Sequence, residues 1–581
     1  MKKAVIIVQS KDADITVKSL CSLGLLHVEH QLEPGGKNIS AIKEDIAIVD
    51  EALAVLSGYR QNRSEPQKAL QDFRAVSRHI IDLSKRLSQS QEYLMSIKAV
   101  ISQWQDWGDF DPDTVKYLAE KNIFIRFYKI PINQIKTLPE SVIIRTISKK
   151  AGMANCVAIS RQKVDIPYKE IALPNMGFTK MRQRFAEDSH LIKSMQHDIE
   201  KHICYSEGLK AAKKQLESGL EFHNAVAGMG LSGDISYITG YIPCNAERPL
   251  RQAGRDNKWA FIITEPSSED NVPTLIRNAR WVEVVKPVFR LLEIVPGYKE
   301  LDISPVFLCF LSLFFGMIIG DAGYGAVYFM LTLLTHKIFA KKAKDEKVFL
   351  LFYIFSGCAV FWGLLTGTVF GQEWFLKAGF KPLAPVLNDT KFLQAFCFFL
   401  GAFHLTLAHA WSGLRKLPSL SAISDAGWIC VLWAAFLAAK TLILNDPFPY
   451  FGKWLIIGGL SLVILCTNPQ RNILKTIASG LAAVALSLMN NFTDVVSYVR
   501  LFAVGLAGIA ISDTVNMLAA GFGPGVISVL IIFLGHTINI VLGPLSVLVH
   551  GIRLNVLEFS GHAGLSWSGI AYKPLKDSAS P

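Results

Sequence analysis

The sequence lacks the short motifs that most catalytic and metal-binding sites require. It has nine cysteines in 581 residues, without a C-x-x-C pair or any spacing that suits a zinc site. It also has no G-x-x-x-x-G-K-[ST] loop, which excludes a P-loop site for ATP, and no recognisable set of nucleophile and base. We therefore expect no catalytic residue, no cofactor and no bound metal in this chain.

The net charge of +12 does not indicate a nucleic-acid-binding protein. The basic residues are spread along polar helical segments and the short loops between apolar segments, and no aromatic residues alternate with them in a basic stripe. Solvated helix faces and signals of membrane orientation explain this charge better. We expect no nucleic-acid partner.

Long apolar runs are absent from residues 1–300 and frequent after them. The first part contains no run near the roughly 18 apolar residues of a membrane-spanning helix, and the apolar stretch at its start is too short for a signal peptide. We therefore expect residues 1–300 to form a cytoplasmic α+β domain and residues 301–581 an α-helical, polytopic membrane domain. The eight predicted spans are about 303–319, 322–339, 347–370, 391–411, 422–443, 450–466, 474–519 and 524–563.

The loops after the second, fourth and sixth predicted spans are rich in basic residues. By the positive-inside rule these loops face the cytoplasm, and an even number of spans then places both termini there too. The basic residues are Lys337, Lys341, Lys342, Lys344, Lys347, Arg415, Lys416, Arg471 and Lys475.

The last two apolar segments are longer than a bilayer needs. About 46 and 40 residues at about 1.5 Å per residue give helices of about 69 and 60 Å, against a hydrocarbon core of about 30 Å. We expect two long, tilted and partly bent helices packed as a hairpin. Gly505, Gly508 and Gly543–Pro544 are points where they could bend.

Each of these two segments contains an arginine, Arg500 or Arg553. A guanidinium stays charged and costs about 2.5–3.5 kcal/mol at the centre of a membrane helix, so these residues indicate a role in managing charge inside the membrane. At about 100° per residue, the helix face of Arg553 also carries Asn539, Ser546 and His550. These side chains could line a water-accessible path.

Other polar residues of the apolar half carry less specific signals. Asp494, Ser497 and Ser512 are weaker candidates for lining an ion path, and Asp494 could equally be a partner in helix packing. His404 and His409, in the fourth predicted span, are better explained as packing histidines than as ligands.

The first half combines two helical arms with short strand-like runs. Apolar residues at spacings of three and four predict an antiparallel coiled coil of residues 37–105 with 178–223. The runs NIFIRFYKI, SVIIRTIS and NCVAIS predict strands of a distal lobe over 115–175. KKAVIIVQ, LLHVEH, ISYITGYIP and WAFIITEP predict a proximal lobe made of 1–35 and 224–275. A mechanical or docking arm explains this pattern better than a site of chemistry.

Four segments carry a resemblance to a known family. They are SYVRLFAVGLAG around Arg500, HGIRLNVLEF around Arg553, FFGMIIGDAGYG at 314–325 and NVPTLIRNARWVEVVKPVFRLLEIVPGYKELDISP at 271–305. They resemble the membrane stator subunit of vacuolar- and archaeal-type (V- and A-type) rotary ATPases, which is called subunit a or, in bacteria and archaea, subunit I. With YITGYIP and YKPL they cover residues 235–573 in order.

The resemblance implies a non-catalytic stator subunit of an ATP-driven, ion-translocating complex in a bacterial or archaeal cell membrane. Arg500 matches the arginine that meets the carboxylate of a passing rotor proteolipid, and Arg553 matches a second arginine on the neighbouring helix. His550 and Glu558 fall where the family has polar residues around that second arginine. The chain has GHAGLSWSG where the family often has a KFYEGG-like run, which leaves the C-terminal edge of the cytoplasmic path unassigned.

The resemblance also implies a set of partners. They are the proteolipid rotor ring (subunit c or K), peripheral stalk subunits of the E and G types, a membrane subunit linked to the central stalk and, indirectly, the ATP-hydrolysing A/B head. Two offset half-channels against the ring would carry protons or sodium ions, coupled to ATP hydrolysis or synthesis. The sequence does not distinguish the two ions.

Two other classes of function remain open on the sequence. An ion-coupled secondary transporter with a regulatory cytoplasmic coiled coil would need inverted repeats and broken half-helices, and no repeat relates 303–443 to 450–563. A signalling or scaffolding membrane protein would use the arm itself, and its intramembrane arginines would be incidental.

Overall fold

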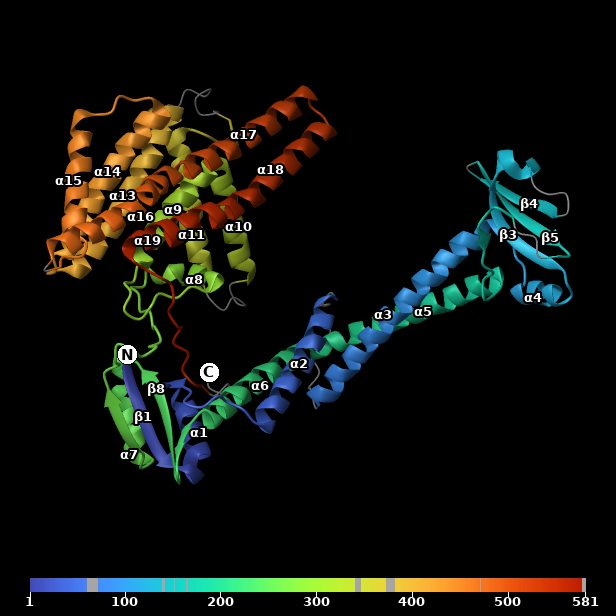
Figure 1. Ribbon diagram of the computed structural model, residues 1–581, viewed down its shortest axis with the longest axis horizontal. Helices are drawn as coiled ribbons and strands as arrows, with labels where there is room; N and C mark the ends of the chain where they lie inside the picture. The colour runs from blue at the N-terminus through green and yellow to red at the C-terminus, as the bar shows by residue number, and fades with distance from the viewer. Residues whose placement is uncertain are drawn as a thin grey trace. The chain divides into compact units, whose positions relative to one another are not determined.

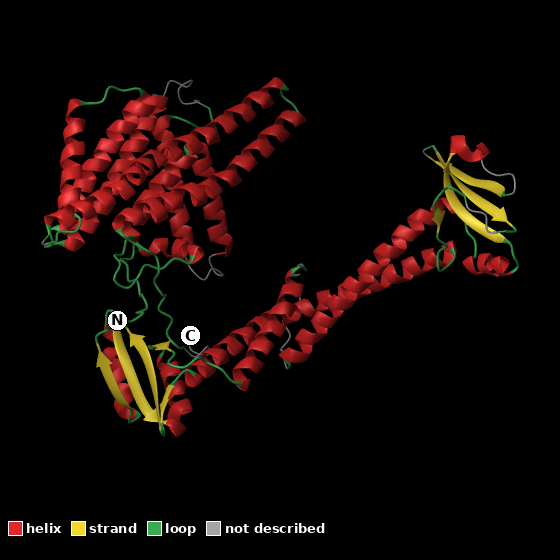
Figure 2. Ribbon diagram, in the orientation of Figure 1, coloured by secondary structure: helices red, strands yellow, loops and turns green. Residues whose placement is uncertain are grey.

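The computed structural model describes residues 1–59, 72–137, 142–150, 152–162, 166–339, 346–372, 382–470 and 472–576. The chain divides into two compact units (Figures 1 and 2). One unit consists of Lys2–Thr264 with Pro574–Pro581, and the other of Glu265–Lys573 with Met1. Four of the basic residues that predict the orientation in the membrane lie outside the described residues: Lys341, Lys342, Lys344 and Arg471.

A sheet in the first unit joins strands that are far apart in the sequence. The antiparallel order is β2 (His27–Glu29), β8 (Ile235–Ile242), β1 (Lys2–Gln9) and β9 (Ala260–Thr264), with β7 (Gly230–Ser232) also on β8. Alternate strand residues such as Ile6 turn one apolar face inward, where α1 (Ala13–Leu23) and α7 (Glu247–Asp256) bury Leu20 and Leu250 against it.

Two pairs of helices connect this sheet with a second one. The chain leaves through α2 (Lys37–Ser57) and α3 (Phe73–Trp104) and returns through α5 (Phe178–Lys201) and α6 (Ser206–Ala227) (Figure 1). α2 packs along α6 and α3 packs along α5. Their common apolar cluster includes Val49, Leu56, Ile80, Ile192 and Leu209. All five of these apolar side chains are buried.

The second sheet lies at the far end of these helices (Figure 2). Its antiparallel order is β4 (Ile143–Lys150), β5 (Met153–Ser160), β3 (Phe124–Pro131) and β6 (Glu170–Ile171), and α4 (Pro112–Glu120) precedes it. Trp104, Trp107 and Phe127 pack with ring centroids between 5.1 and 5.5 Å apart and join the end of α3 to the sheet.

The second unit is mostly helical. Five of its described helices are long and apolar enough to cross a membrane: α11 (Lys347–Thr366), α13 (Thr390–Lys416), α14 (Ser421–Leu444), Ile473–Gly521 and Val526–Ala563. Two shorter apolar helices are α9 (Ser304–Ile319) and α15 (Tyr450–Cys466), and further helices are α8 (Lys286–Leu292) and α10 (Ala322–Phe339). By length and composition the described part of the chain provides five spans, whereas the sequence predicts eight.

The last two apolar stretches are long helices with local irregularities. α16 (Ile473–Ser497) and α17 (Val499–Gly521) are separated only by a turn at Tyr498, and together they span 49 residues. α18 (Val526–Ser546) continues through π-helical turns at Val547–Gly551 and Leu554–Phe559 into α19 (Ser560–Ala563). α17 and α18 pack against each other and run obliquely across other helices of this unit (Figure 1).

The irregularity of the last stretch follows Pro544 in α18. Proline lacks an N–H and displaces the carbonyl group four residues earlier, which is that of Ile540. The Tyr328 hydroxyl on α10 donates to this carbonyl at 2.8 Å, so the freed acceptor is satisfied. The departure from α-helical geometry therefore begins near Gly543–Pro544, one of the predicted points of bending. At Gly505, another of these points, α17 continues as an α-helix.

The motif FFGMIIGDAGYG forms the turn from α9 to α10. The Asp321 carboxylate accepts hydrogen bonds from the backbone N–H groups of Tyr324 (3.0 Å), Phe370 (2.9 Å) and Gly371 (2.8 Å). Gly505 lets α17 approach the end of α9 closely, because a Cβ there would lie 2.6 Å from a carbonyl oxygen of α9. The motif therefore fixes how α10, the loop after α11 and α17 meet.

An ion-pair cluster in the same unit should be sensitive to acid. Hydrogen bonds from Lys286 and Lys347, each at 2.7 Å, lower the pKa of the Glu283 carboxyl from 4.5 to about 2. A carboxyl with a lowered pKa in the folded state stabilises the fold above its unfolded pKa, and this contribution is lost as the pH falls through the folded value. We expect Glu283→Gln to lower the thermal unfolding midpoint at neutral pH. The difference from the wild type should shrink between pH 4.5 and about 2. A difference that is independent of pH would contradict this assignment.

Candidate functional site

Arg500 and Glu558 form an ion pair within the apolar helices. Arg500 lies in the first turn of α17, directly after the turn at Tyr498, and its Nη2 is 2.5 Å from Glu558 Oε1. Its Nε donates to the Ser497 carbonyl at 3.0 Å. The Glu558 side chain is 6% exposed and the Arg500 side chain 23% exposed. The carboxylate is therefore buried, while the guanidinium reaches the surface of the chain.

A second arginine shares the same carboxylate. Arg553 Nε is 3.7 Å from Glu558 Oε1, and the Arg553 side chain is 58% exposed. Two guanidinium groups against one carboxylate leave a net positive charge. Glu558 Oε2 is buried and has no hydrogen-bond partner in the described part of the chain. Because unbalanced charge is costly away from water, the arrangement favours a further negative group beside Arg500.

A cavity of about 670 Å³ opens beside Glu558, between residues of α13, α14, α16 and α19. Its titratable lining residues are His409, Lys416, Asp425, Asp494, Glu558 and His562. The sequence favours a packing role for His409, but the structure places this residue at the cavity. His404 is fully buried, and its Nδ1 is 2.8 Å from the Tyr498 hydroxyl, as befits a packing histidine.

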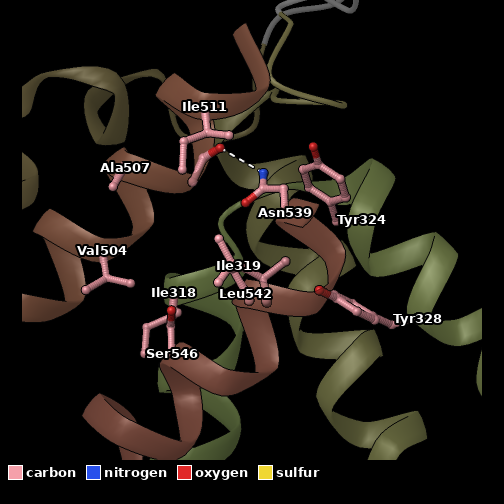
Figure 3. Close-up of a pocket in the computed structure, with 12 residues that line it drawn as sticks. Ile318, Ile319, Tyr324, Tyr328, Val504, Ala507, Ile511, Asn539, Leu542 and Ser546 are labelled. Carbon is pink, nitrogen blue, oxygen red and sulfur yellow. Dashed lines mark hydrogen bonds between the residues drawn. The ribbon is translucent and has the colours of Figure 1, made fainter. Parts of the chain in front are cut away.

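A smaller cavity of about 120 Å³ lies between α9, α10, α17 and α18 (Figure 3). Asn539 and Ser546 line it, and Asn539 Nδ2 donates to the Gly508 carbonyl at 2.9 Å and to Ser512 Oγ at 2.8 Å. The apolar side of the cavity is formed by residues that include Ile318, Ile319, Val504, Ala507, Ile511 and Leu542.

Hydrogen bonds continue from this smaller cavity. Tyr324 Oη is 2.7 Å from Ser512 Oγ and 2.6 Å from His536 Nδ1, and His536 Nε2 is 3.1 Å from Asn516 Oδ1. Sequence reasoning did not single out Tyr324, Asn516 or His536. His536 lies three residues before Asn539, and this spacing on one helix face is a signal that could have found it.

The structure divides the predicted site residues between two places. The group at the smaller cavity consists of Ser512, Asn539 and Ser546. The group near Arg500 consists of Asp494, Ser497, Arg553 and Glu558. His550 lies between the two in sequence and is half-buried. The single stripe expected from regular α-helical spacing is interrupted, because most of residues 547–559 are π-helical and successive side chains turn by a different angle.

Known proteins resemble the chain over its whole length, although no family model matches it. The V-type ATP synthase subunit I 1 of Treponema pallidum is 30% identical over 629 residues, which cover 99% of this chain and 99% of that one. The chain belongs to the subunit I family of V-type ATP synthases. The V-type subunit I of Borreliella burgdorferi is 29% identical over 614 residues, again 99% of each chain. The A-type subunit I of Methanocaldococcus jannaschii is 24% identical over 386 residues, 58% of this chain and 54% of that one.

Membership of the subunit I family confirms the resemblance carried by the motifs around Arg500 and Arg553. The relatives are named as subunits of V-type and A-type ATP synthases. Because five described helices are long and apolar enough to cross a membrane, this subunit I is a multi-pass membrane protein.

Proposed function

We propose that this subunit I is the non-catalytic stator of a V/A-type rotary ATPase and forms the ion path against a ring of rotor proteolipids. The observation that carries the proposal is Arg500, a permanent charge that lies inside an apolar helix and is 23% exposed. In the sequence it lies between Asp494, which lines the large cavity, and Val504, which lines the small one. ATP hydrolysis elsewhere in the complex would turn the ring, or ion flow would turn it to make ATP.

The large and the small cavity support an ion path that consists of two separate half-channels. Along α16 and α17, Asp494 lies six residues before Arg500 and Ser512 twelve residues after it. These offsets are about 9 and 18 Å in opposite directions. Asp494 lines the large cavity, and Ser512 binds Asn539 at the small one. An ion that enters through one cavity would bind a rotor carboxylate and travel with the turning ring, away from Arg500, before it leaves through the other cavity.

The guanidinium of Arg500 would couple ion movement along this path to rotation of the ring. A fixed positive charge beside a passing carboxylate favours the ionised carboxylate, because opposite charges attract strongly where water is scarce. The rotor carboxylate would therefore release its ion before it passes Arg500 and take up another afterwards. The same charge repels a cation that moves directly between the cavities, so ion flow stays tied to rotation.

Glu558 would hold Arg500 while no rotor carboxylate is beside it. Its Oε1 is 2.5 Å from Arg500 Nη2, so an arriving carboxylate would share or replace this contact. The nearby Arg553 would keep the local charge positive during the exchange. His550 and Ser497 would contribute polar groups close to these charges.

The proposal gives the two parts of the chain separate roles. Residues 1–300 would be a cytoplasmic arm that resists torque through peripheral stalk subunits of the E and G types. Its parts would be a proximal lobe (1–35 and 224–275), a coiled coil (37–105 with 178–223) and a distal lobe (115–175). Residues 301–581 would cross the membrane eight times, with both termini in the cytoplasm. The two helix pairs with a sheet at each end support the arm.

Contact with a rotor distinguishes this proposal from an ion-coupled secondary transporter. Ala503 and Ala507 are exposed on α17 close to Arg500, and such small residues let another helix approach. A photoreactive amino acid in place of Ala503 should therefore cross-link to a proteolipid in the assembled complex. Ion transport by the purified chain alone would favour the transporter instead.

A further inference from the structure

The large cavity contains an unbroken line of side chains from four helices. Lys416 Nζ is 2.7 Å from Asp425 Oδ2, and Asp425 Oδ1 is 3.3 Å from His409 Nδ1. His409 Nε2 is 2.9 Å from His562 Nδ1, and His562 Nε2 is 3.0 Å from Asp494 Oδ2. The line begins at Lys416, whose side chain is 44% exposed, and ends at Asp494.

Three hydrogen bonds connect the two carboxylates of this line, and together they require three protons. The contacts are Asp425–His409, His409–His562 and His562–Asp494, and each is a hydrogen bond only if one proton lies between its two atoms. A neutral imidazole carries one N–H, so two neutral histidines supply only two protons. The line is therefore complete only when it holds one extra proton, which either imidazole or either carboxylate can carry.

The charges around the cavity agree with an extra proton. Asp425 and Asp494 bring two negative charges and Lys416 brings one positive charge, so the line becomes neutral when it binds one proton more. The remaining titratable residue of the lining, Glu558, is balanced by Arg500 at 2.5 Å.

His404 stands apart from this line although it lies on the same helix as His409. Its Nδ1 faces the Tyr498 hydroxyl at 2.8 Å, and its ring stacks on Phe310 and Phe559. The extra proton is therefore assigned to the line between Asp425 and Asp494.

We propose that the ion carried by this complex is a proton, and that His409 and His562 pass it through the large cavity. This inference rests on the proposed function and adds the identity of the ion. A proton from water binds Asp425, which is buried next to the exposed Lys416 at one end of the line, and moves to His409 Nδ1. The proton on His409 Nε2 moves to His562 Nδ1, and the proton on His562 Nε2 moves to Asp494. Each transfer breaks one N–H or O–H bond and forms another, so the number of protons on the line is restored once Asp494 gives its proton to the rotor carboxylate of the proposed function.

Sodium is poorly suited to this line of side chains. Hard cations are bound by several oxygen ligands at once. The central contact of the line instead joins two ring nitrogens, His409 Nε2 and His562 Nδ1, with no room for a cation at 2.9 Å. A proton requires only the hydrogen bonds that the line already makes.

The test measures ATP-driven uptake by the intact complex in sealed vesicles. A pH-sensitive dye reports protons and a sodium-sensitive dye reports sodium ions, in buffers with and without sodium. We expect proton uptake that does not need sodium. In His562→Ala it should be about a hundredfold slower, the low end of what a positioned proton-transfer group contributes. The matched control is His336→Ala, which removes a half-buried histidine of α10 that contacts Tyr353.

Chemical rescue separates proton transfer from a structural role. The cavity of about 670 Å³ can admit imidazole, so added imidazole should restore uptake in His562→Ala and in His409→Ala. His562→Gln keeps a hydrogen-bonding side chain but cannot relay a proton, and it should stay slow. The variants are compared at equal subunit content of the purified complex.

The results distinguish this inference from the proposed function. Sodium uptake without proton uptake, or wild-type proton uptake by His562→Gln, would overturn the inference and leave the stator role intact. Uptake that survives the loss of Arg500 would overturn the stator role. If His562→Ala does not assemble, His562→Gln and His409→Ala decide the question.

Discussion

Complexes that carry Arg500→Ala are expected to assemble normally but to move no ions across the membrane when they are given ATP. Without the guanidinium, nothing drives the rotor carboxylate into its ionised form at the point where the two halves of the path meet. The measurement is ATP-driven ion uptake by purified complexes in sealed vesicles, compared at equal subunit content.

Three further variants make this experiment specific to Arg500. Arg500→Ala alone leaves the buried Glu558 with Arg553 at 3.7 Å, so the double variant with Glu558→Gln removes the stranded charge and should still be inactive. Arg500→Lys keeps the charge but loses the planar fork, and we expect it to be strongly impaired. Arg415→Ala, at the end of α13, is the matched control and should transport at the wild-type rate. Transport by the double variant would disprove the role given to Arg500.

Glu558→Ala should have the largest effect on the stability of the membrane unit. It removes the carboxylate that Arg500 and Arg553 share, and removing one partner of a buried ion pair costs about 3–5 kcal/mol. We expect a clear fall in the thermal unfolding midpoint of the purified complex in detergent, together with a loss of ion uptake.

The comparison with Glu558→Gln shows whether the charge or the contact matters. The amide oxygen of glutamine can still accept from Arg500 Nη2, so this variant should lose less stability than Glu558→Ala. Glu269→Ala, which changes an exposed glutamate of the same unit, is the control for the general effect of losing a negative charge. An unchanged midpoint in Glu558→Ala would show that the Arg500–Glu558 pair is not a stabilising interaction.

Much of the fold could be predicted because local patterns carry it. The strand-like run at residues 2–9 and the run before Pro243 became β1 and β8, which pair in an antiparallel sheet. The long apolar stretches became long helices, since apolar length is visible in any window of sequence. The turn at Tyr498 and the π-helical turns after Pro544 were not predictable in detail, because helix geometry there depends on partners such as the Tyr328 hydroxyl.

The site was predictable in its charges but not in its pairings. Arg500 and Arg553 stand out because an arginine inside an apolar helix is costly wherever it lies. Their shared partner Glu558 is 58 residues from Arg500, and the contact exists only because the last helix folds back along α16 and α17. His409 and His562 are 153 residues apart, so their contact is set by tertiary packing and left no local signal.

The most direct test of the stator role is the cross-linking experiment from Ala503, an exposed residue close to Arg500 on α17. After illumination of the intact complex, this account predicts an adduct in which the chain has gained the mass of one proteolipid, with no such adduct from Ala426, an exposed residue of α14. Adducts with lipid alone at Ala503 would mean that no rotor faces Arg500, and would contradict the account.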